Sequence, residues 1–131
     1  MNSNTIFNER SVINLVYLLT ACFIALDMLT GLIKAFKEKS YTSSVMREGL
    51  FHKSGSIMCV VFASLIDYAQ SYIDIGIQVP VTIGICAYII LMEIGSIVEN
   101  ICAINPDIMS DKLKSYFLKL EGKENKKNGN S

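Results

Sequence analysis

The chain has 131 residues, and its 12 basic and 12 acidic side chains give a formal net charge of zero. This balance excludes the basic excess that is typical of nucleic-acid-binding domains, and the length predicts one compact unit. The apolar residues, 51% of the chain, gather in three blocks, whereas most lysines and arginines lie between or after these blocks. Such a distribution is typical of an integral membrane protein.

The first apolar block carries no charge from Ser11 to Leu26, continues apolar beyond Asp27 and ends at Lys34. A helix over residues 12–33 is about 33 Å long, which is enough to cross a hydrocarbon core of about 30 Å. The sequence Leu-Thr-Ala-Cys at 19–22 is similar to a lipoprotein cleavage site, but the chain stays apolar after it. We therefore predict that this block is retained as a transmembrane helix.

Residues 34–53 form a polar connection, with a turn predicted at residues 40–44 and a short interfacial helix at residues 45–52. The connection carries a net charge of +3, from two glutamates and five basic residues: Lys34, Lys37, Lys39, Arg47 and Lys53.

The second block covers residues 54–73 and has no charge before Asp67; the third covers residues 75–100. Asp-Ile-Gly at 74–76 predicts a tight turn between them. Pro80 lies in the first turns of the third block, where proline is tolerated best. The first and third blocks lack the continuous polar face of a helix in a soluble bundle, so we predict an all-α membrane protein with three transmembrane helices.

Residues 106–131 are predicted to form a helix followed by a disordered Lys/Asn-rich tail. Asn-Pro-Asp at 105–107 is typical of a helix N-terminus, and Gly122 is predicted to end the helix. Apolar residues recur along it at helical spacing: Met109, Leu113, Tyr116, Phe117 and Leu120. With three spans, this region lies on the same side of the membrane as the 34–53 connection.

Both regions are basic, so the positive-inside rule predicts that they face the cytoplasm and that the N-terminus lies outside. The basic residues predicted to be cytoplasmic are Lys37, Lys39, Arg47, Lys53, Lys112, Lys114 and Lys119.

Polar and small residues inside the apolar blocks are the candidate functional residues. A charge deep in a bilayer costs roughly 2.5–3.5 kcal/mol on insertion scales, so such residues usually face a partner or water. Small residues allow close approach of another helix. We predict a polar seam that assembles oligomers or lines an aqueous lesion, formed by Asp27, Thr30, Gly31 and Lys34, by Gly55, Cys59, Ala63, Asp67 and Ser71, and by Glu93, Ser96, Glu99 and Asn100. Alternatively, the carboxylates lie at membrane edges, where their cost is smaller.

No catalytic constellation is visible in the sequence. His52 is the single histidine, and the four cysteines form no C-x-x-C pair. We predict that Cys22, Cys59, Cys86 and Cys102 are reduced core residues, and that the chain is not an enzyme and has no metal or cofactor.

Asp-Met-Leu-Thr-Gly-Leu-Ile-Lys-Ala at 27–35 resembles the D-x-L-T-G-x-x-K-A signature of phage lysis holins, a family that includes the toxin-secretion holins of clostridia. The similarity continues at residues 43–44, at Gly49 and Lys53, at Asp67, and through residues 93–100, which are similar to the family's E-x-x-S-I-x-E-N stretch.

This resemblance implies a non-enzymatic protein that forms homo-oligomers in the bacterial cytoplasmic membrane and opens lesions in the lipid. The lesions release or activate an endolysin or a large toxin, with no direct binding implied. A small transporter or channel subunit, and a membrane scaffold that recruits soluble partners through its basic tail, are the competing hypotheses.

Overall fold

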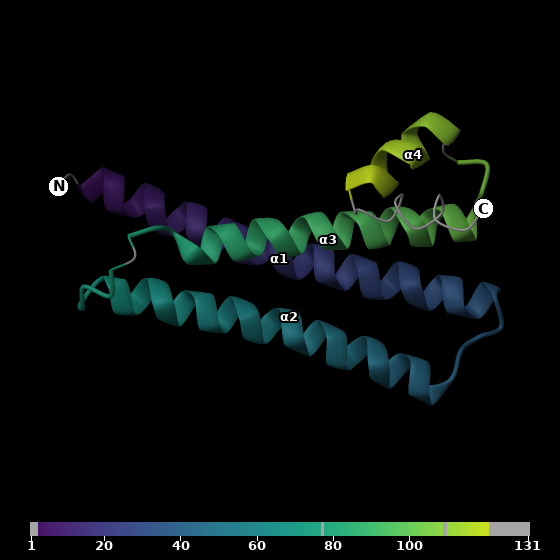
Figure 1. Ribbon diagram of the computed structural model, residues 1–131, viewed down its shortest axis with the longest axis horizontal. Coiled ribbons are helices and arrows are strands. Elements are labelled where there is room, and N and C mark those ends of the chain that lie inside the picture. Colours follow the sequence, from purple (N-terminus) through teal and green to yellow (C-terminus); the bar gives the residue numbers. More distant parts are fainter. Residues whose placement is uncertain (1–2, 77, 109, 121–131) are drawn as a thin grey trace, which may run out of the picture.

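The protein is a bundle of three long helices with a short fourth helix. The computed structural model describes residues 3–76, 78–108 and 110–120, and every regular element among them is an α-helix. Helices α1 (Ser3–Lys37), α2 (Ser43–Gln70) and α3 (Val81–Ile104) run side by side, and α4 (Asp111–Leu120) folds back over the C-terminal half of α3 (Figure 1). Helix α3 packs extensively on α1 and less on α2, whereas α1 and α2 have few contacts.

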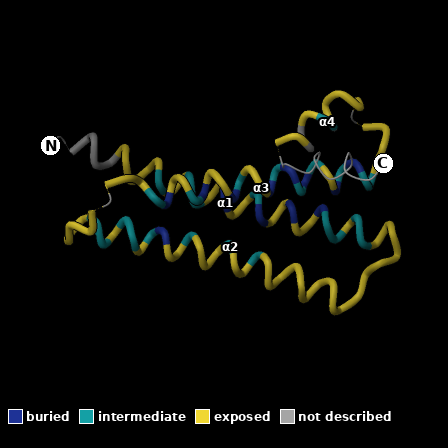
Figure 2. Tube along the Cα trace, viewed as in Figure 1, coloured by how far each residue is buried: buried dark blue, intermediate teal, exposed yellow. Residues whose placement is uncertain are grey.

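The three long helices have the length and the surface of membrane spans. The shortest, α3, has 24 residues and is therefore roughly 36 Å long. Within the most apolar 18-residue window of each helix, the share that is buried is only 17% for α1, 6% for α2 and 33% for α3. Figure 2 shows α2 exposed along most of its length. A soluble monomer rarely exposes apolar surface on this scale, so these faces contact lipid and the prediction of an all-α multi-pass membrane protein is confirmed.

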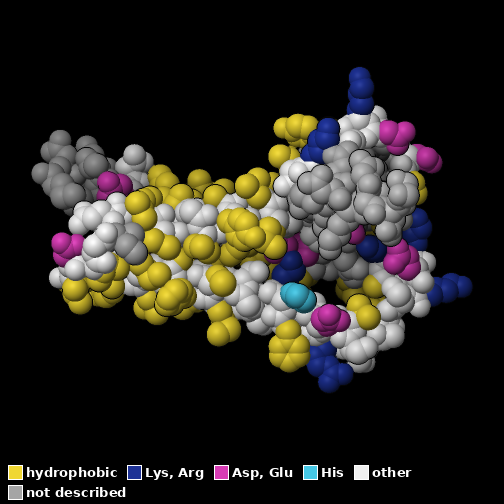
Figure 3. Space-filling view, in the orientation of Figure 1, with side chains coloured by type: hydrophobic (Ala, Val, Ile, Leu, Met, Phe, Trp, Pro, Cys, Tyr) yellow, Lys and Arg dark blue, Asp and Glu magenta, His cyan; other side chains and the backbone are white. Residues whose placement is uncertain are grey.

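The charged residues mark one end of the bundle. In Figure 3 hydrophobic side chains cover the middle of the molecule, while most Lys, Arg, Asp and Glu side chains gather at the end that holds the α1–α2 connection. The same end holds the C-terminus of α3 (Figure 1). This charge gradient along the bundle axis matches the change from hydrocarbon to headgroup region that a spanning helix experiences.

Two predicted boundaries between helices are wrong. The expected short helix at 45–52 and the second span from residue 54 are one continuous helix, which begins after Thr42. The Thr42 hydroxyl oxygen accepts a hydrogen bond from the backbone N–H of Val45 at 3.3 Å and so caps α2. The third helix begins at Val81 rather than at Ile75, because Gly76 has a φ of +74° and Pro80 adopts a non-helical backbone.

The start of the last helix also differs from the prediction. Asn105 ends α3 instead of starting α4, and its side-chain oxygen accepts a hydrogen bond from the N–H of Asp107 at 3.3 Å. Asparagine followed by proline favours a turn of this kind as well as a helix start, and here the turn separates α3 from α4. Met109, the side chains of Lys114 and Phe117, and the predicted tail with Gly122 lie outside the described residues.

Charged side chains from the other two helices cap both ends of α3. The carboxylate of Asp67 on α2 accepts hydrogen bonds from the backbone N–H groups of Val81 and Thr82, both at 2.8 Å. At the other end, the Lys37 ammonium on α1 donates to the carbonyl oxygens of Ala103, at 2.8 Å, and Ile104, at 2.7 Å. An anion at the N-terminus and a cation at the C-terminus both complement the helix dipole, so these contacts fix the register of α3 against α1 and α2.

Candidate functional site

Each long helix contributes one charged side chain to a cluster inside the bundle. The Lys53 ammonium on α2 lies 2.7 Å from Oδ2 of Asp27 on α1, and it also donates a hydrogen bond to Oε2 of Glu93 on α3. Asp27 and Glu93 are only 7% and 4% exposed. Burying a charge is costly unless it is paired, so the shared ammonium is what permits two carboxylates at this depth.

Asn100 and Thr30 complete the hydrogen bonding of Asp27. The Asn100 amide donates to Oδ1 of Asp27 at 3.1 Å and to the Thr30 hydroxyl oxygen at 3.2 Å. The Thr30 hydroxyl in turn donates to the backbone carbonyl of Asp27 at 3.1 Å. Both carboxylate oxygens of Asp27 are therefore satisfied within the bundle, as an environment without water requires.

Gly31 gives Asn100 the space to reach Asp27. A Cβ atom built at Gly31 lies 3.5 Å from the Asn100 amide nitrogen, which is ordinary van der Waals contact. We expect Gly31→Ala to keep the thermal unfolding midpoint in detergent, whereas Gly31→Leu displaces Asn100 and costs about 1–3 kcal/mol for the lost hydrogen bonds. Gly84→Leu is the matched control, because a Cβ at Gly84 meets nothing within 4 Å. An equal loss in both leucine variants would contradict this role for Gly31.

A cavity of about 790 Å³ adjoins the ion cluster between α2 and α3. Asp27, Lys53 and Glu93 all line it, together with His52 and, from α4, Leu120. Its lining residues on α2 fall within residues 49–56, in the half of α2 that diverges from α3 in Figure 1. The cavity therefore leaves one side of the buried charges without packed side chains, while the remaining sides of the cluster are covered by the helices.

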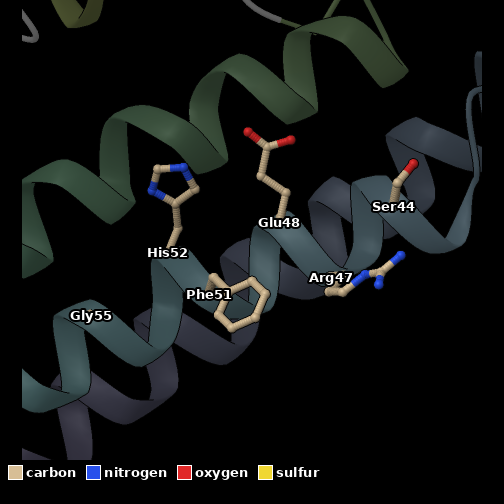
Figure 4. A pocket seen from close by; sticks show the side chains of 6 residues that line it. All are labelled: Ser44, Arg47, Glu48, Phe51, His52 and Gly55. Carbon is tan, nitrogen blue, oxygen red and sulfur yellow. The ribbon is translucent and has the colours of Figure 1, made fainter.

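The N-terminal part of α2 is not covered by other helices. Every residue from 43 to 52 is exposed. A second hollow of about 580 Å³ lies on this segment, lined by Ser44, Arg47, Glu48, Phe51, His52 and Gly55. Figure 4 shows Glu48 and His52 extending to the side of α2 on which α3 lies, whereas Arg47 and Phe51 extend away from it. His52 thus belongs to the linings of both hollows.

The structure brings together only part of the predicted polar seam. Asp27, Thr30, Gly31, Glu93 and Asn100 meet in the cluster region, and Ser96 lines the adjoining cavity. The remaining predicted residues of α1 and α3 lie outside the cluster: Lys34 is half-buried and Glu99 is exposed.

The small-residue stripe predicted on α2 does not form one buried face. Ala63 is buried and Asp67 half-buried, but Gly55, Cys59 and Ser71 are exposed. A spacing of four residues drifts by about 40° per step around a helix of 3.6 residues per turn. Residues four apart therefore wind around α2, and the stripe passes from the side that faces the bundle to the exposed side. The residues of α2 that do contact the bundle are spaced alternately three and four apart.

Lys53 is the site residue that sequence reasoning placed elsewhere, among the basic residues of a polar connection. The available signal was its position directly before the charge-free stretch of α2, together with the carboxylates Asp27 and Glu93 in the other two spans. Of the other basic residues, Lys37 caps α3, and four are exposed: Lys39, Arg47, Lys112 and Lys119.

The cysteine prediction is correct for only two of the four residues. Cys86 and Cys102 are buried, whereas Cys22 and Cys59 are exposed on the apolar outer surface; all four are free thiols. The exposed pair contacts lipid rather than a protein core, which suits small apolar side chains equally well.

Comparison with known proteins identifies a family. The profile of the bacteriophage holin family matches residues 7–122. The matched region contains all four helices except the first residues of α1, and it includes every member of the ion cluster. No curated protein and no solved structure matches the chain.

Proposed function

Because the chain belongs to the bacteriophage holin family, we propose that it oligomerises in the bacterial cytoplasmic membrane and opens a lesion there. The lesion gives an endolysin or a large toxin access to the cell wall, without direct binding to the holin. Proteins of this family are in general not enzymes, and permeabilisation needs no catalytic group. The activity depends instead on how the helices arrange polar and apolar surface.

The observation that carries this proposal is the ion cluster inside a three-span membrane protein. Asp27, Lys53 and Glu93 are placed where a charge is expensive, and a purely structural bundle of this size has no need of them. In the monomer they are hidden from lipid. When the helices rearrange in an assembly, the same side chains, whether exposed or paired between copies, supply polar surface to a water-filled lesion.

The experiment is controlled expression in a bacterium that carries a membrane-potential dye. A holin gives abrupt, non-selective depolarisation after a delay, and a co-expressed endolysin then lyses the cells. Steady growth with an unchanged potential at high expression would overturn the proposal and favour a scaffold.

A small transporter or channel subunit is the second candidate, because ionisable residues beside a cavity also mark solute pathways. The same expression experiment separates the two. A transporter gives currents that depend on a particular solute, and it does not cause sudden loss of the potential.

For orientation we propose that the N-terminus lies outside and that α4 lies in the cytoplasm, supported by the basic residues of segment 34–53 and of α4. In a cysteine-free background, we expect a membrane-impermeant maleimide to label Tyr72→Cys in spheroplasts before depolarisation. Ser40→Cys in the opposite connection is the matched position and should react only after detergent is added. The reverse labelling pattern would show that the protein has the opposite orientation in the membrane.

A further inference from the structure

Of the three long helices, α2 is the one that the bundle holds most weakly. Its most apolar window is only 6% buried, and its first ten residues are exposed. Lipid is as apolar as the side chains, so apolar contact adds little to hold a helix in place, and polar ties carry more of the attachment.

Three polar ties join α2 to the other long helices in the described part of the chain. The carboxylate of Asp67 caps α3 next to the α2–α3 connection. Ser64 shares a hydrogen bond of 2.6 Å with the Tyr17 hydroxyl on α1. Lys53, about 21 Å along the helix from Asp67, forms the ion pairs with both α1 and α3.

The pair formed by α1 and α3 has polar contacts of its own that do not involve α2. Asn100 links the two helices through Asp27 and Thr30, and Lys37 caps the end of α3. If α2 moved away at its Lys53 end, the Asp27 and Glu93 carboxylates would face a membrane environment on an otherwise intact surface. These carboxylates need a cation there, and Lys53 on the separated α2 needs an anion.

We propose that this acidic surface of α1 and α3, with Asp27 and Glu93 at its centre, is the docking site for α2 of a second copy of the chain. Lys53 of each copy then pairs with the carboxylates of its neighbour. Identical copies carry one Lys53 for each acidic pair, so every cluster in the assembly is complete. Where each copy passes its α2 to the next, the contact is heterologous, head to tail, and such contacts generate rings when the rotation between copies closes.

The cavity supports this exchange. It already separates α2 from α3 beside the cluster, and its α2 wall includes the small residues Gly49 and Ser56. Small residues on a helix let a neighbouring backbone approach closely. The inference rests on the proposed function, because it specifies the contact by which a holin of this sequence assembles.

Complementation between two chains tests the exchange. The first chain carries Lys53→Glu and has an intact acidic pair; the second carries Asp27→Asn with Glu93→Lys and has an intact Lys53. Each chain alone has unpaired like charges within itself and should fail to depolarise cells. In a mixed assembly, α2 of each chain meets the complementary surface of the other, so co-expression should restore depolarisation to at least half of the wild-type amplitude.

The matched control combines all three substitutions in one chain, which reverses the charges within each copy. Restored activity in this chain together with no complementation between the separate chains would overturn the proposal, because the ion pairs would then act only within a copy.

Crosslinking gives a second test that does not depend on lysis. In a cysteine-free background, Ser56→Cys and Met92→Cys place thiols on the α2 and α3 walls of the cavity. When the two substitutions are on separate, differently tagged chains, a short bismaleimide should join the two tags in membranes. Phe62→Cys, on the exposed side of α2, replaces Ser56→Cys in the control and should give at most a tenth of the adduct.

The two failures are distinguishable. A wild-type chain that never depolarises cells removes the proposed function, whereas the crosslink still reports which copy supplies α2. Adducts that form only when both thiols are on the same chain would refute the exchange even if depolarisation is normal.

Discussion

Replacing Lys53 with methionine is expected to destabilise the bundle by about 3–5 kcal/mol, because the substitution leaves two buried carboxylates without their cation. Methionine keeps much of the length and apolar stem of lysine, so the change isolates the loss of the charge. The thermal unfolding midpoint in detergent, followed by circular dichroism, should fall clearly below that of the wild type.

Arg47→Met is the matched control for this change. Arg47 lies on the same helix, six residues earlier, but it is exposed. Its replacement should alter stability by no more than about 0.5 kcal/mol. A similar loss of stability in both variants would show that the ion cluster makes no specific contribution to the stability of the bundle.

Removing all three charges should recover most of the stability. A chain with Lys53→Met, Asp27→Asn and Glu93→Gln has no buried ion left to compensate, and replacing a whole buried ion cluster is often neutral. The recovery separates the cost of an unpaired charge from the loss of packing. If the triple variant is as unstable as Lys53→Met alone, the ionic explanation is wrong.

Asp67→Ala is expected to lower stability by about 2 kcal/mol, because two backbone N–H groups at the start of α3 lose their acceptor. This value is at the upper end for helix caps, because one carboxylate accepts hydrogen bonds from two N–H groups. Hydrogen exchange at the backbone amides of Val81 and Thr82 measures directly whether these groups are capped, and it should become faster in the variant.

Asp74→Ala is the control in the same connection. The Asp74 carboxylate accepts a hydrogen bond from the exposed N–H of Gly76 at 3.0 Å, where water can take its place. We expect a loss of less than about 1 kcal/mol and unchanged exchange at the start of α3. Protected amides at Val81 and Thr82 in Asp67→Ala would exclude the capping role.

The sequence determined the architecture because lipid imposes a simple requirement. Charge-free stretches of sufficient length must be helices that satisfy their own backbone, and this reasoning correctly predicts three spans. It also singles out Asp27 and Glu93, since a carboxylate within such a stretch is conspicuous without any knowledge of its surroundings. Helix boundaries were predicted less well, because Pro80 and Asn105 are compatible with more than one local conformation.

Only the tertiary structure decided which side chains meet. Lys53 is the last basic residue of segment 34–53, and nothing in its local sequence indicates that α2 continues through it and brings its ammonium between α1 and α3. Asp67 likewise becomes a cap for α3 only because the connection at residues 71–80 returns the chain to it. Both contacts join residues on different helices, and such pairings are set by helix packing rather than by the periodicity of any single segment.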